Sequence, residues 1–342
     1  MEILKISLSD FLAHVNKKIQ AGDSKQVGVV PKGSHFVFGE LDEAAQLCLD
    51  YDVTILPPKK YFQPQREVLV KYAPKDASSY AMVNDCENLT LIGVHPYDLV
   101  AIHLMDRAFS EGERDENYMA KRDCSVLIGL YPTRGFEHRF SASMIDPQMP
   151  YKVADLMLIK LDDNQLALEV VSKKGKAYLE GAAVAKSDLS EAFLAQARNK
   201  VKDSQAFPLG PDKSPAYFKE KYEHPVWEKL GEKCYSCGSC VFVCPTCYCF
   251  DVRDEVELSL ASGERVRYWD GCMIESFAIC AGDHNFRKER GARFRHRVFR
   301  KTVTLPEKYQ VMGCVGCGRC AQACTADIAG PMKVIKTMKE MN

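Results

Sequence analysis

The sequence predicts two domains, an α/β domain over residues 1–215 and a smaller α+β domain over residues 216–342. Helical and strand-like patterns alternate along the first domain, which is typical of a sheet covered by helices. The composition then changes at 203–215, where prolines, a glycine and small polar residues indicate a linker. After residue 230 one cysteine pattern occurs twice, which sets the second domain apart. A chain of 342 residues is long enough for two ordinary domains.

The spacing of apolar residues predicts the helices and strands of the first domain. Positions that recur at helical spacing predict helices over 7–20, 41–51 and 97–109. Short apolar runs predict strands over 26–31, 52–57, 89–94 and 124–131, and residues 156–171 are typical of a hairpin.

The overall composition excludes several classes of protein. The chain is 46% hydrophobic and has 46 basic and 46 acidic residues, so its net charge indicates no polyanionic partner. The N-terminus lacks the apolar core of a signal peptide. No stretch approaches the roughly 18 apolar residues of a membrane span. We therefore expect a soluble cytoplasmic protein, in which most of the 15 cysteines serve as metal ligands instead of disulfides.

Eight cysteines form two copies of the spacing C-x2-C-x2-C-x3-C, which iron–sulfur proteins use. In two-cluster ferredoxins the fourth cysteine of each motif reaches the other cluster. By that rule one [4Fe–4S] cluster would have the ligands Cys234, Cys237, Cys240 and Cys324. The second would have the ligands Cys314, Cys317, Cys320 and Cys244. The second domain is therefore predicted to be a ferredoxin-like α+β dicluster domain with a long insertion, 245–313, between its two cluster motifs.

Zinc is the alternative metal, because it also binds C-x2-C pairs. A zinc site needs four ligands from two pairs, and it gives no reason for a third cysteine or for Pro245 after the fourth. Thr325 follows Cys324 where a proline is usual, but a proline there shapes the loop and binds nothing. The doubled motif therefore favours iron–sulfur clusters.

The insertion contains cysteines that the doubled motif does not use. Cys247, Cys249, Cys272 and Cys280 lie in it. We expect ordinary buried thiols that pack as small hydrophobic residues. A third metal centre stays open as the alternative.

The insertion also contains a basic segment, 286–301, with interleaved aromatic residues. Such a segment raises the question of nucleic-acid binding. Residues 231–342 carry 17 Lys or Arg against 13 Asp or Glu, a small excess that two anionic clusters would cancel. We therefore expect the arginines to compensate cluster charge, to join the domains or to bind an acidic partner, and we expect no nucleic acid.

Several motifs resemble those of the family that includes the beta subunits of sulfhydrogenases and the corresponding iron–sulfur subunits of anaerobic sulfite reductases. They are CYSCGSCVFVCPTCYCFDVRD, RYWDGCM, AGDHNFR and CVGCGRC in the second domain, and LPPKKYFQPQREVLVKY, IGVHPYDLVAIHLMDRAF and RDENYMAKRD in the first. Cys247, Cys249 and Cys272 recur in the family motifs, which favours a shared role for these three.

The resemblance implies an iron–sulfur subunit that relays electrons inside a multisubunit oxidoreductase. Its partners would be a flavoprotein subunit with FAD that handles NAD(P)H and a catalytic subunit of hydrogenase or sulfite reductase type. The chain has no G-x-G-x-x-G after a strand, so we expect it to bind no dinucleotide itself. We identify no catalytic residue. A redox-sensing or scaffold module is the alternative function.

The chain departs from the family in its first domain. Tyr97, Tyr131, His138 and Phe140 stand where relatives commonly have cysteines that are similar to the ligands of a further cluster. We therefore expect that cluster to be absent. Cys86 and Cys124 lie nearby but out of register, and we expect them to be unrelated thiols.

Three other polar residues are expected to have structural roles. We expect Asp98 and Asp106 to cap or pair on their own helix. His284 lies in a family motif, and we expect it to be a buried structural histidine.

Overall fold

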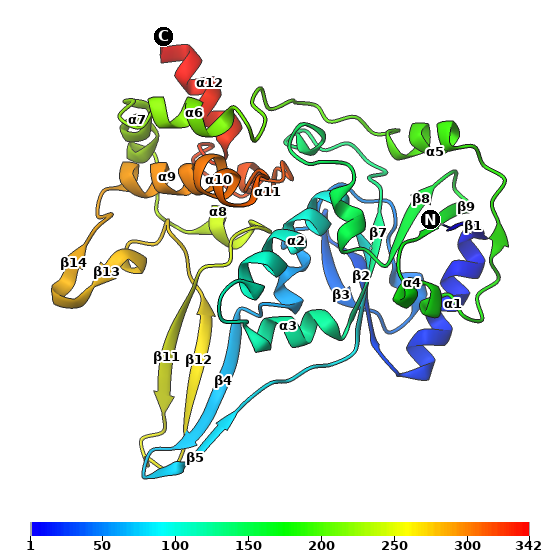
Figure 1. Cartoon of the computed structure of the whole chain (residues 1–342), viewed down its shortest axis with the longest axis horizontal. Helices are drawn as coiled ribbons and strands as arrows, with labels where there is room; N and C mark the ends of the chain where they lie inside the picture. The colour runs from blue at the N-terminus through cyan, green and yellow to red at the C-terminus, as the bar shows by residue number, and fades with distance from the viewer. Residues whose placement is uncertain (1, 342) are drawn as a thin grey trace.

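The computed structural model describes residues 2–341 and shows a mixed α/β protein. Its largest element is an eight-stranded sheet with the order β10-β1-β9-β8-β7-β6-β2-β3 (Figure 1). The strands are β1 (Glu2–Ser7), β2 (Lys25–Lys32), β3 (His35–Glu40), β6 (Leu89–Val94), β7 (Ser125–Leu130), β8 (Leu156–Lys160), β9 (Gln165–Val170) and β10 (Ala185–Lys186). The four central strands β2, β6, β7 and β8 are parallel, whereas the outer pairs are antiparallel.

Helices and short turns complete this part of the chain. They are α1 (Leu8–Ala21), α2 (Pro96–Ser110), α3 (Glu116–Asp123), α4 (Lys173–Tyr178) and α5 (Glu191–Arg198), with 3-10 turns at η1 (Ala44–Gln46), η2 (Pro58–Tyr61), η3 (Ser141–Ser143) and η4 (Met149–Lys152). Ser7 caps α1 by accepting a hydrogen bond from the Asp10 backbone N–H, and Gly22 ends it in the left-handed conformation. All six residues of β6 are buried, as a central parallel strand requires.

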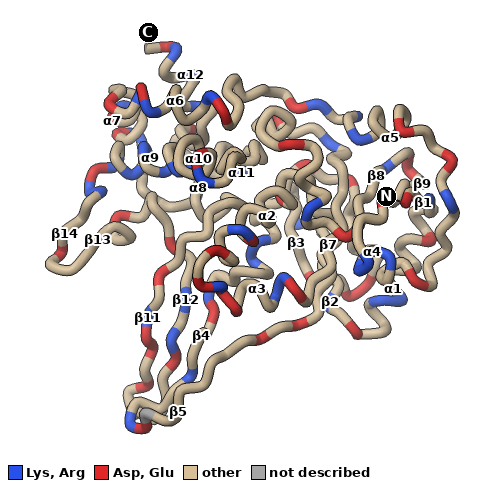
Figure 2. Tube along the Cα trace, viewed as in Figure 1, with Lys and Arg blue, Asp and Glu red and all other residues tan. Residues whose placement is uncertain are grey.

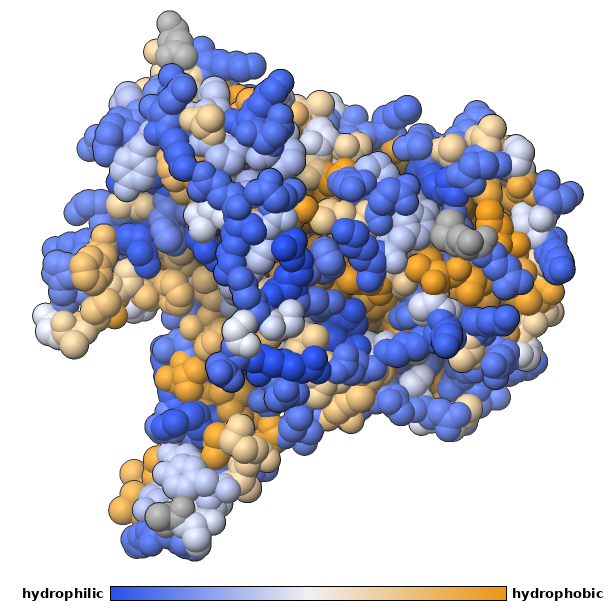
Figure 3. All heavy atoms as spheres, viewed as in Figure 1, coloured by the Kyte–Doolittle hydropathy of each residue, from blue (hydrophilic) through white to orange (hydrophobic). Residues whose placement is uncertain are grey.

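A second sheet projects from the molecule as an arm (Figure 1). It has the antiparallel order β11-β12-β4-β5, formed by β4 (Arg66–Ala73), β5 (Asp76–Met82), β11 (Phe250–Val256) and β12 (Gly263–Trp269). Strands from both sides of residue 215 therefore share one sheet, through the pairing of β12 with β4. Acidic and basic residues are interspersed along it (Figure 2), and hydrophobic surface is exposed on the arm (Figure 3). Met82 of β5 and Leu258 in the turn between β11 and β12 are among the exposed hydrophobic residues.

Short helices form most of the regular structure in the remaining chain. They are α6 (Ser214–Glu220), α7 (Val226–Glu232), α8 (Ser239–Phe242), α9 (Arg290–Phe299), a π-helical segment (Arg300–Thr304), α10 (Leu305–Tyr309), α11 (Arg319–Gln322) and α12 (Pro331–Met341). A hairpin of β13 (Ile279–Cys280) and β14 (His284–Asn285) lies between η5 (Ser276–Ala278) and α9, with η6 (Ala281–Asp283) at its turn. No helix within residues 2–341 is both long and apolar enough to cross a membrane.

Two predicted elements are wrong. Residues 41–51 form only the turn η1, because their backbone bonds to a neighbouring strand: Leu41 N–H donates to the Gln26 carbonyl and Cys48 N–H to the Val29 carbonyl. Residues 52–57 contribute a single bridge, between Thr54 and Phe36. The other predicted helices and strands of the first domain are present, with ends that differ by one or two residues.

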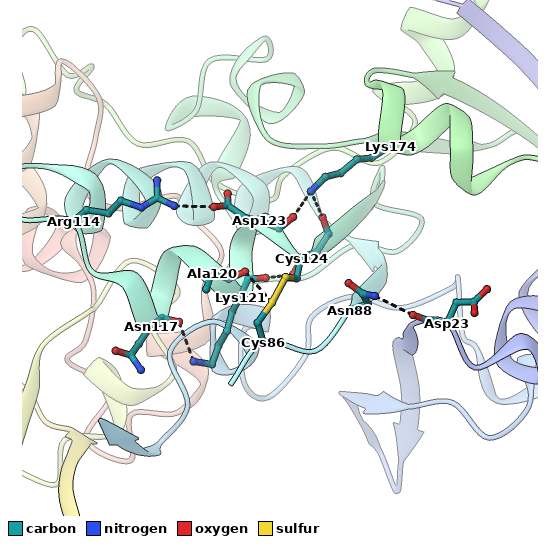
Figure 4. The surroundings of a disulfide bond; sticks show 11 residues. Asp23, Cys86, Asn88, Arg114, Asn117, Ala120, Lys121, Asp123, Cys124 and Lys174 are labelled. Carbon is teal, nitrogen blue, oxygen red and sulfur yellow. Dashed lines mark hydrogen bonds and ion pairs between the residues drawn. A yellow bond between two sulfur atoms is a disulfide. The ribbon is translucent and has the colours of Figure 1, made fainter. Parts of the chain in front are cut away.

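Cys86 and Cys124 form a disulfide, which corrects the expectation of unrelated thiols. Their Cα atoms lie 6.6 Å apart. The bond joins the segment after β5 to the C-terminal end of α3 (Figure 4).

Candidate iron–sulfur site

The two cysteine motifs form two loops of matching conformation. In each, a residue with positive φ precedes the second cysteine, Ser236 at 53° and Gly316 at 65°. A second residue with positive φ follows that cysteine, Gly238 at 76° and Gly318 at 82°, and a four-residue helix begins directly after it. The two helices, α8 and α11, pack against each other. The motifs therefore face each other as two similar halves.

Four cysteines line a small cavity of about 30 Å³ in the first half of this arrangement. They are Cys234, Cys237, Cys240 and Cys324. Apolar residues, among them Met273, Phe294 and Ile328, form much of the remaining wall, and no charged side chain among the described residues lines it. The cysteine from the second motif thus joins three from the first.

Four other cysteines line a larger cavity of about 380 Å³. They are Cys244, Cys314, Cys317 and Cys320. This wall contains a histidine, His138, and charged residues, namely Glu137, Arg297, Lys301, Asp327, Lys333 and Lys336. Each motif therefore contributes its fourth cysteine to the cavity of the other motif.

The donors at these cavities fit iron–sulfur clusters. Each cavity offers four sulfur atoms, and nearby backbone N–H groups point to two of them: Ser236 N lies 3.4 Å from Cys234 Sγ, and Ile328 N lies 3.4 Å from Cys324 Sγ. Burial raises the pKa of the Cys240 and Cys314 thiols to about 12. Because the ligands are thiolates, cluster insertion must release these protons.

Helix α9 lies along the first cysteine loop and bonds it with three arginines. Arg290 donates to the Cys234 carbonyl at 2.8 Å, and Arg297 donates to the Cys240 carbonyl at 2.9 Å. Between them, Arg293 donates to Ser236 Oγ at 2.8 Å. The spacing of three and four residues places the arginines on one face of the helix. The basic segment therefore orders the cysteine loop.

The second cysteine loop packs against the first part of the chain. Arg319, between Cys317 and Cys320, forms a bidentate ion pair with Asp98 of α2 at 2.6 and 2.7 Å, and both side chains are buried. Arg319 also donates to the Thr54 carbonyl at 2.7 Å. A Cβ atom at Gly316 would lie 2.7 Å from the Phe140 backbone, so only glycine permits this approach.

The four cysteines outside the doubled motif occupy different environments. Cys272 is buried in the hydrophobic cluster that contains Cys234, and Cys247 packs against that cluster. Cys249 is half-buried. Cys280 is exposed in the β13 hairpin, so the expectation of a buried thiol is wrong for it. Within residues 2–341, no three His, Cys, Asp or Glu side chains converge closely enough to hold a single metal ion.

Three of the four family cysteine positions, Tyr97, His138 and Phe140, lie around the second cysteine loop, and Tyr131 packs against the main hydrophobic core. Tyr97 is buried beside Cys317, and Tyr131 donates to or accepts from Tyr151 Oη at 2.7 Å. Phe140 stacks with Phe207, and His138 lines the larger cavity.

Three expectations for polar residues are wrong. Asp98 pairs with Arg319 and not with its own helix. Asp106 of α2 pairs with Arg122 of α3, because the two helices pack together. His284 is exposed, with its ring 4.5 Å from that of Phe286, since the hairpin leaves the core.

Two buried lysines lie beside the cysteines: sequence reasoning missed Lys59 and included Lys301 only as the end of the basic segment 286–301. Lys301 donates to Thr246 Oγ1 at 2.6 Å, and Lys59 donates to the Cys247 carbonyl. A helical signal in the sequence, the spacing of Arg290, Arg293, Arg297 and Lys301, could have identified Lys301 as one of the cations beside the cysteines. It could not have identified Lys59.

The comparisons with known proteins agree with this geometry. Residues 233–328 match the family model of a 4Fe-4S dicluster domain. The chain is 30% identical over 343 residues to sulfhydrogenase 2 subunit beta of Pyrococcus furiosus, and the match covers 99% of each protein. No solved structure matches. The chain therefore belongs to the sulfhydrogenase beta-subunit family and carries a 4Fe-4S dicluster domain.

Proposed function

We propose that the chain relays single electrons through two [4Fe–4S] clusters. Cys234, Cys237, Cys240 and Cys324 hold one cluster, and Cys314, Cys317, Cys320 and Cys244 hold the other. The observation that carries this proposal is the pair of adjoining cavities, each lined by four cysteines drawn from both motifs. A [4Fe–4S] cluster supplies one-electron transfer without the movement of heavy atoms.

The chain's own residues hold the two sites together. Packing of α8 against α11 fixes the separation of the two loops. Met273 and Phe294 form an apolar part of the wall of the smaller cavity, whereas its cysteine Cys237 is exposed. The arginines of α9 hold the carbonyls of the first loop in place. On this proposal residues 1–215 form the α/β domain, and 216–342 form a ferredoxin-like domain with the insertion 245–313.

The partners are a flavoprotein subunit that exchanges electrons with NAD(P)H and a catalytic oxidoreductase subunit of hydrogenase or sulfite reductase type. The likeness to a sulfhydrogenase beta subunit over 99% of both chains supports a place in such a complex. No side chain in the described part of the chain forms an acid–base pair or a nucleophile that we would assign to catalysis.

Anaerobic purification of the full chain tests the number of clusters. Two clusters require about eight iron atoms and as many sulfides per chain. About twelve would overturn the two-cluster proposal in favour of a third centre, to which Cys247, Cys249 and Cys272 would contribute. Cys320→Ser should lose iron or change the EPR spectrum, whereas the control Cys280→Ser should leave both unchanged.

Partner capture distinguishes the relay from a redox sensor. A relay should purify with flavin-containing and catalytic subunits and should restore NAD(P)H-dependent turnover to them. A sensor should act as an isolated chain and lose its clusters readily in air. Purification of the chain alone in full activity would contradict the relay.

A further inference from the structure

Three buried cations beside the cysteines have no carboxylate partner. Lys59, Arg297 and Lys301 are 3%, 2% and 4% exposed. Among residues 2–341, no Asp or Glu oxygen lies within 4.0 Å of their charged nitrogens. Their hydrogen bonds go to neutral oxygens of residues 240, 246 and 247. Arg297 Nε and Nη1 have no partner at all. We call these three residues the cation trio.

Other buried cations of the chain are paired with carboxylates. Arg319 bonds Asp98, Arg139 bonds Asp203, and Arg267 bonds Glu67. Burying a charge is unfavourable unless an opposite charge compensates it. Arg297 and Lys301 therefore require a nearby anion that is not a carboxylate, whereas Lys59 also lies 4.2 Å from the centroid of the Trp269 ring, which compensates part of its charge.

The position of the trio identifies that anion. Arg297 and Lys301 line the larger cavity together with Cys244, Cys314, Cys317 and Cys320. Lys59 donates to the carbonyl of Cys247, three residues after Cys244 in the sequence. Thiolate ligands and the cluster they hold are anionic, and they are the groups that these cations face.

The smaller cavity has a different electrostatic environment. Its wall among the described residues contains no charged side chain. Arg290 and Arg293 lie behind its loop and are bonded to a carbonyl and a hydroxyl. Arg293 also has a carboxylate, that of Glu275, at 3.8 Å. Arg297 lines the larger cavity but also donates to the carbonyl of Cys240, which lines the smaller one. The two cavities thus differ by Lys301, which lines only the larger one, and by the polarity of their walls.

We infer that the cation trio gives the cluster at Cys244, Cys314, Cys317 and Cys320 the higher reduction potential of the two. This inference rests on the proposed function. One-electron reduction adds a negative charge, which nearby cations stabilise and an apolar wall destabilises. An electron that enters at the smaller cavity therefore moves to the larger one, where it is held.

A redox titration of the full chain tests the inference. The anaerobic protein, loaded to about eight iron atoms, is poised at a series of potentials and followed by EPR. Two one-electron waves are expected. Arg297→Gln, Lys301→Gln and Lys59→Gln should each lower the higher wave. The expected shift is at least about tenfold in the ratio of reduced to oxidised cluster, which is about 59 mV.

Control variants show which cluster moves. Arg295→Gln removes a charge from the same helix at a residue that pairs with Glu223, and it should move neither wave. Arg297→Lys should retain most of the wild-type potential. Cys237→Ser should alter the lower wave and Cys320→Ser the higher one.

Two results would overturn the inference. One is a Cys237→Ser variant that alters the higher wave, and the other is a set of trio variants that leaves both waves in place. If one of the three trio variants fails to fold, the other two variants and the assignment of the two wild-type waves to the two cavities still test the inference. A chain that binds fewer than about eight iron atoms would instead contradict the proposed function itself.

Discussion

Arg319 connects a cysteine loop to the α/β part of the chain. In the sequence Arg319 lies between Cys317 and Cys320, which line the larger cavity. Its charge is nevertheless compensated by Asp98 of α2. Thr54 supplies two further acceptors, its carbonyl and its hydroxyl. The guanidinium group is therefore committed to the interface and is not available to the larger cavity.

Asp98→Asn should strongly destabilise the protein. It leaves the Arg319 charge buried without a partner, which typically costs about 3–5 kcal/mol. The apparent free energy of unfolding is measured by denaturant titration of the anaerobic protein, followed by the loss of cluster absorbance. Asp254→Asn is the matched control, because the Arg265–Asp254 pair is exposed and should contribute less than about 1 kcal/mol. Equal losses in both variants would contradict the prediction.

His95 should make the fold sensitive to acid. Burial and, to a smaller extent, the nearby charges of Arg139 and Arg319 lower its pKa from 6.5 to about 3, against the opposing effect of the hydrogen bond to the Leu130 carbonyl. Below pH 6.5 the unfolded chain binds a proton at this site and the folded chain does not. The contribution of neutral His95 is therefore present above that pH and is lost as the pH falls towards 3.

The His95→Gln variant tests this pH dependence. Its free energy of unfolding should fall less steeply between pH 6.5 and 5 than that of the wild type, by about 1.4 kcal/mol per pH unit at most. The glutamine can still donate to the Leu130 carbonyl. Parallel pH profiles for the two proteins would contradict the assignment.

At the scale of elements, helix α9 depends on a close crossing with α7. A Cβ atom at Gly231 would lie 2.5 Å from the Gly291 backbone nitrogen, so the helices touch through their backbones. This approach brings the arginines of α9 onto the first cysteine loop.

Gly231→Ala should separate the two helices and loosen that loop. Overpacking of this kind typically costs about 1–3 kcal/mol. We expect faster iron loss to a chelator, measured anaerobically by absorbance. Gly135→Ala is the control, because nothing lies within 4 Å of its added Cβ atom. Equal rates of iron loss in both variants would show that the crossing does not support the loop.

The sequence predicts an element well where the contacting residues lie close together in the sequence, and poorly where they lie far apart in it. Each cysteine loop is local in the sequence, so spacing predicted the two loops. The exchange of the fourth cysteines was expected from the rule for two-cluster ferredoxins, and the two ligand sets stay a prediction that agrees with the lining of the cavities. The arm was missed because β4 and β12 bond across the chain, with Arg267 bonding Glu67 at a separation of 200 residues. Residues 52–57 resemble a strand, but the Thr54 carbonyl bonds Arg319.

For the molecule as a whole, the shared arm and the Arg319 interface predict that residues 216–342 will not fold well alone. That fragment lacks β4, the partner of β12, and Asp98, the partner of Arg319. We expect aggregation and less than half of the full-chain iron content, measured by size-exclusion chromatography and iron analysis after anaerobic reconstitution. A monomeric fragment with the full iron content would contradict this.

The pairing of β4 with β12 also affects the order of folding during synthesis. The β4–β5 hairpin leaves the ribosome early, but its partner strand ends only at Trp269. At a synthesis rate of about 5–20 residues per second, the edge of β4 stays unpaired for roughly ten seconds or more. An open strand edge is a site for pairing with other chains. During this period, before any iron is inserted, the open edge of β4 can pair with other chains. A chaperone, or slow expression at low temperature, should therefore raise the yield of folded protein.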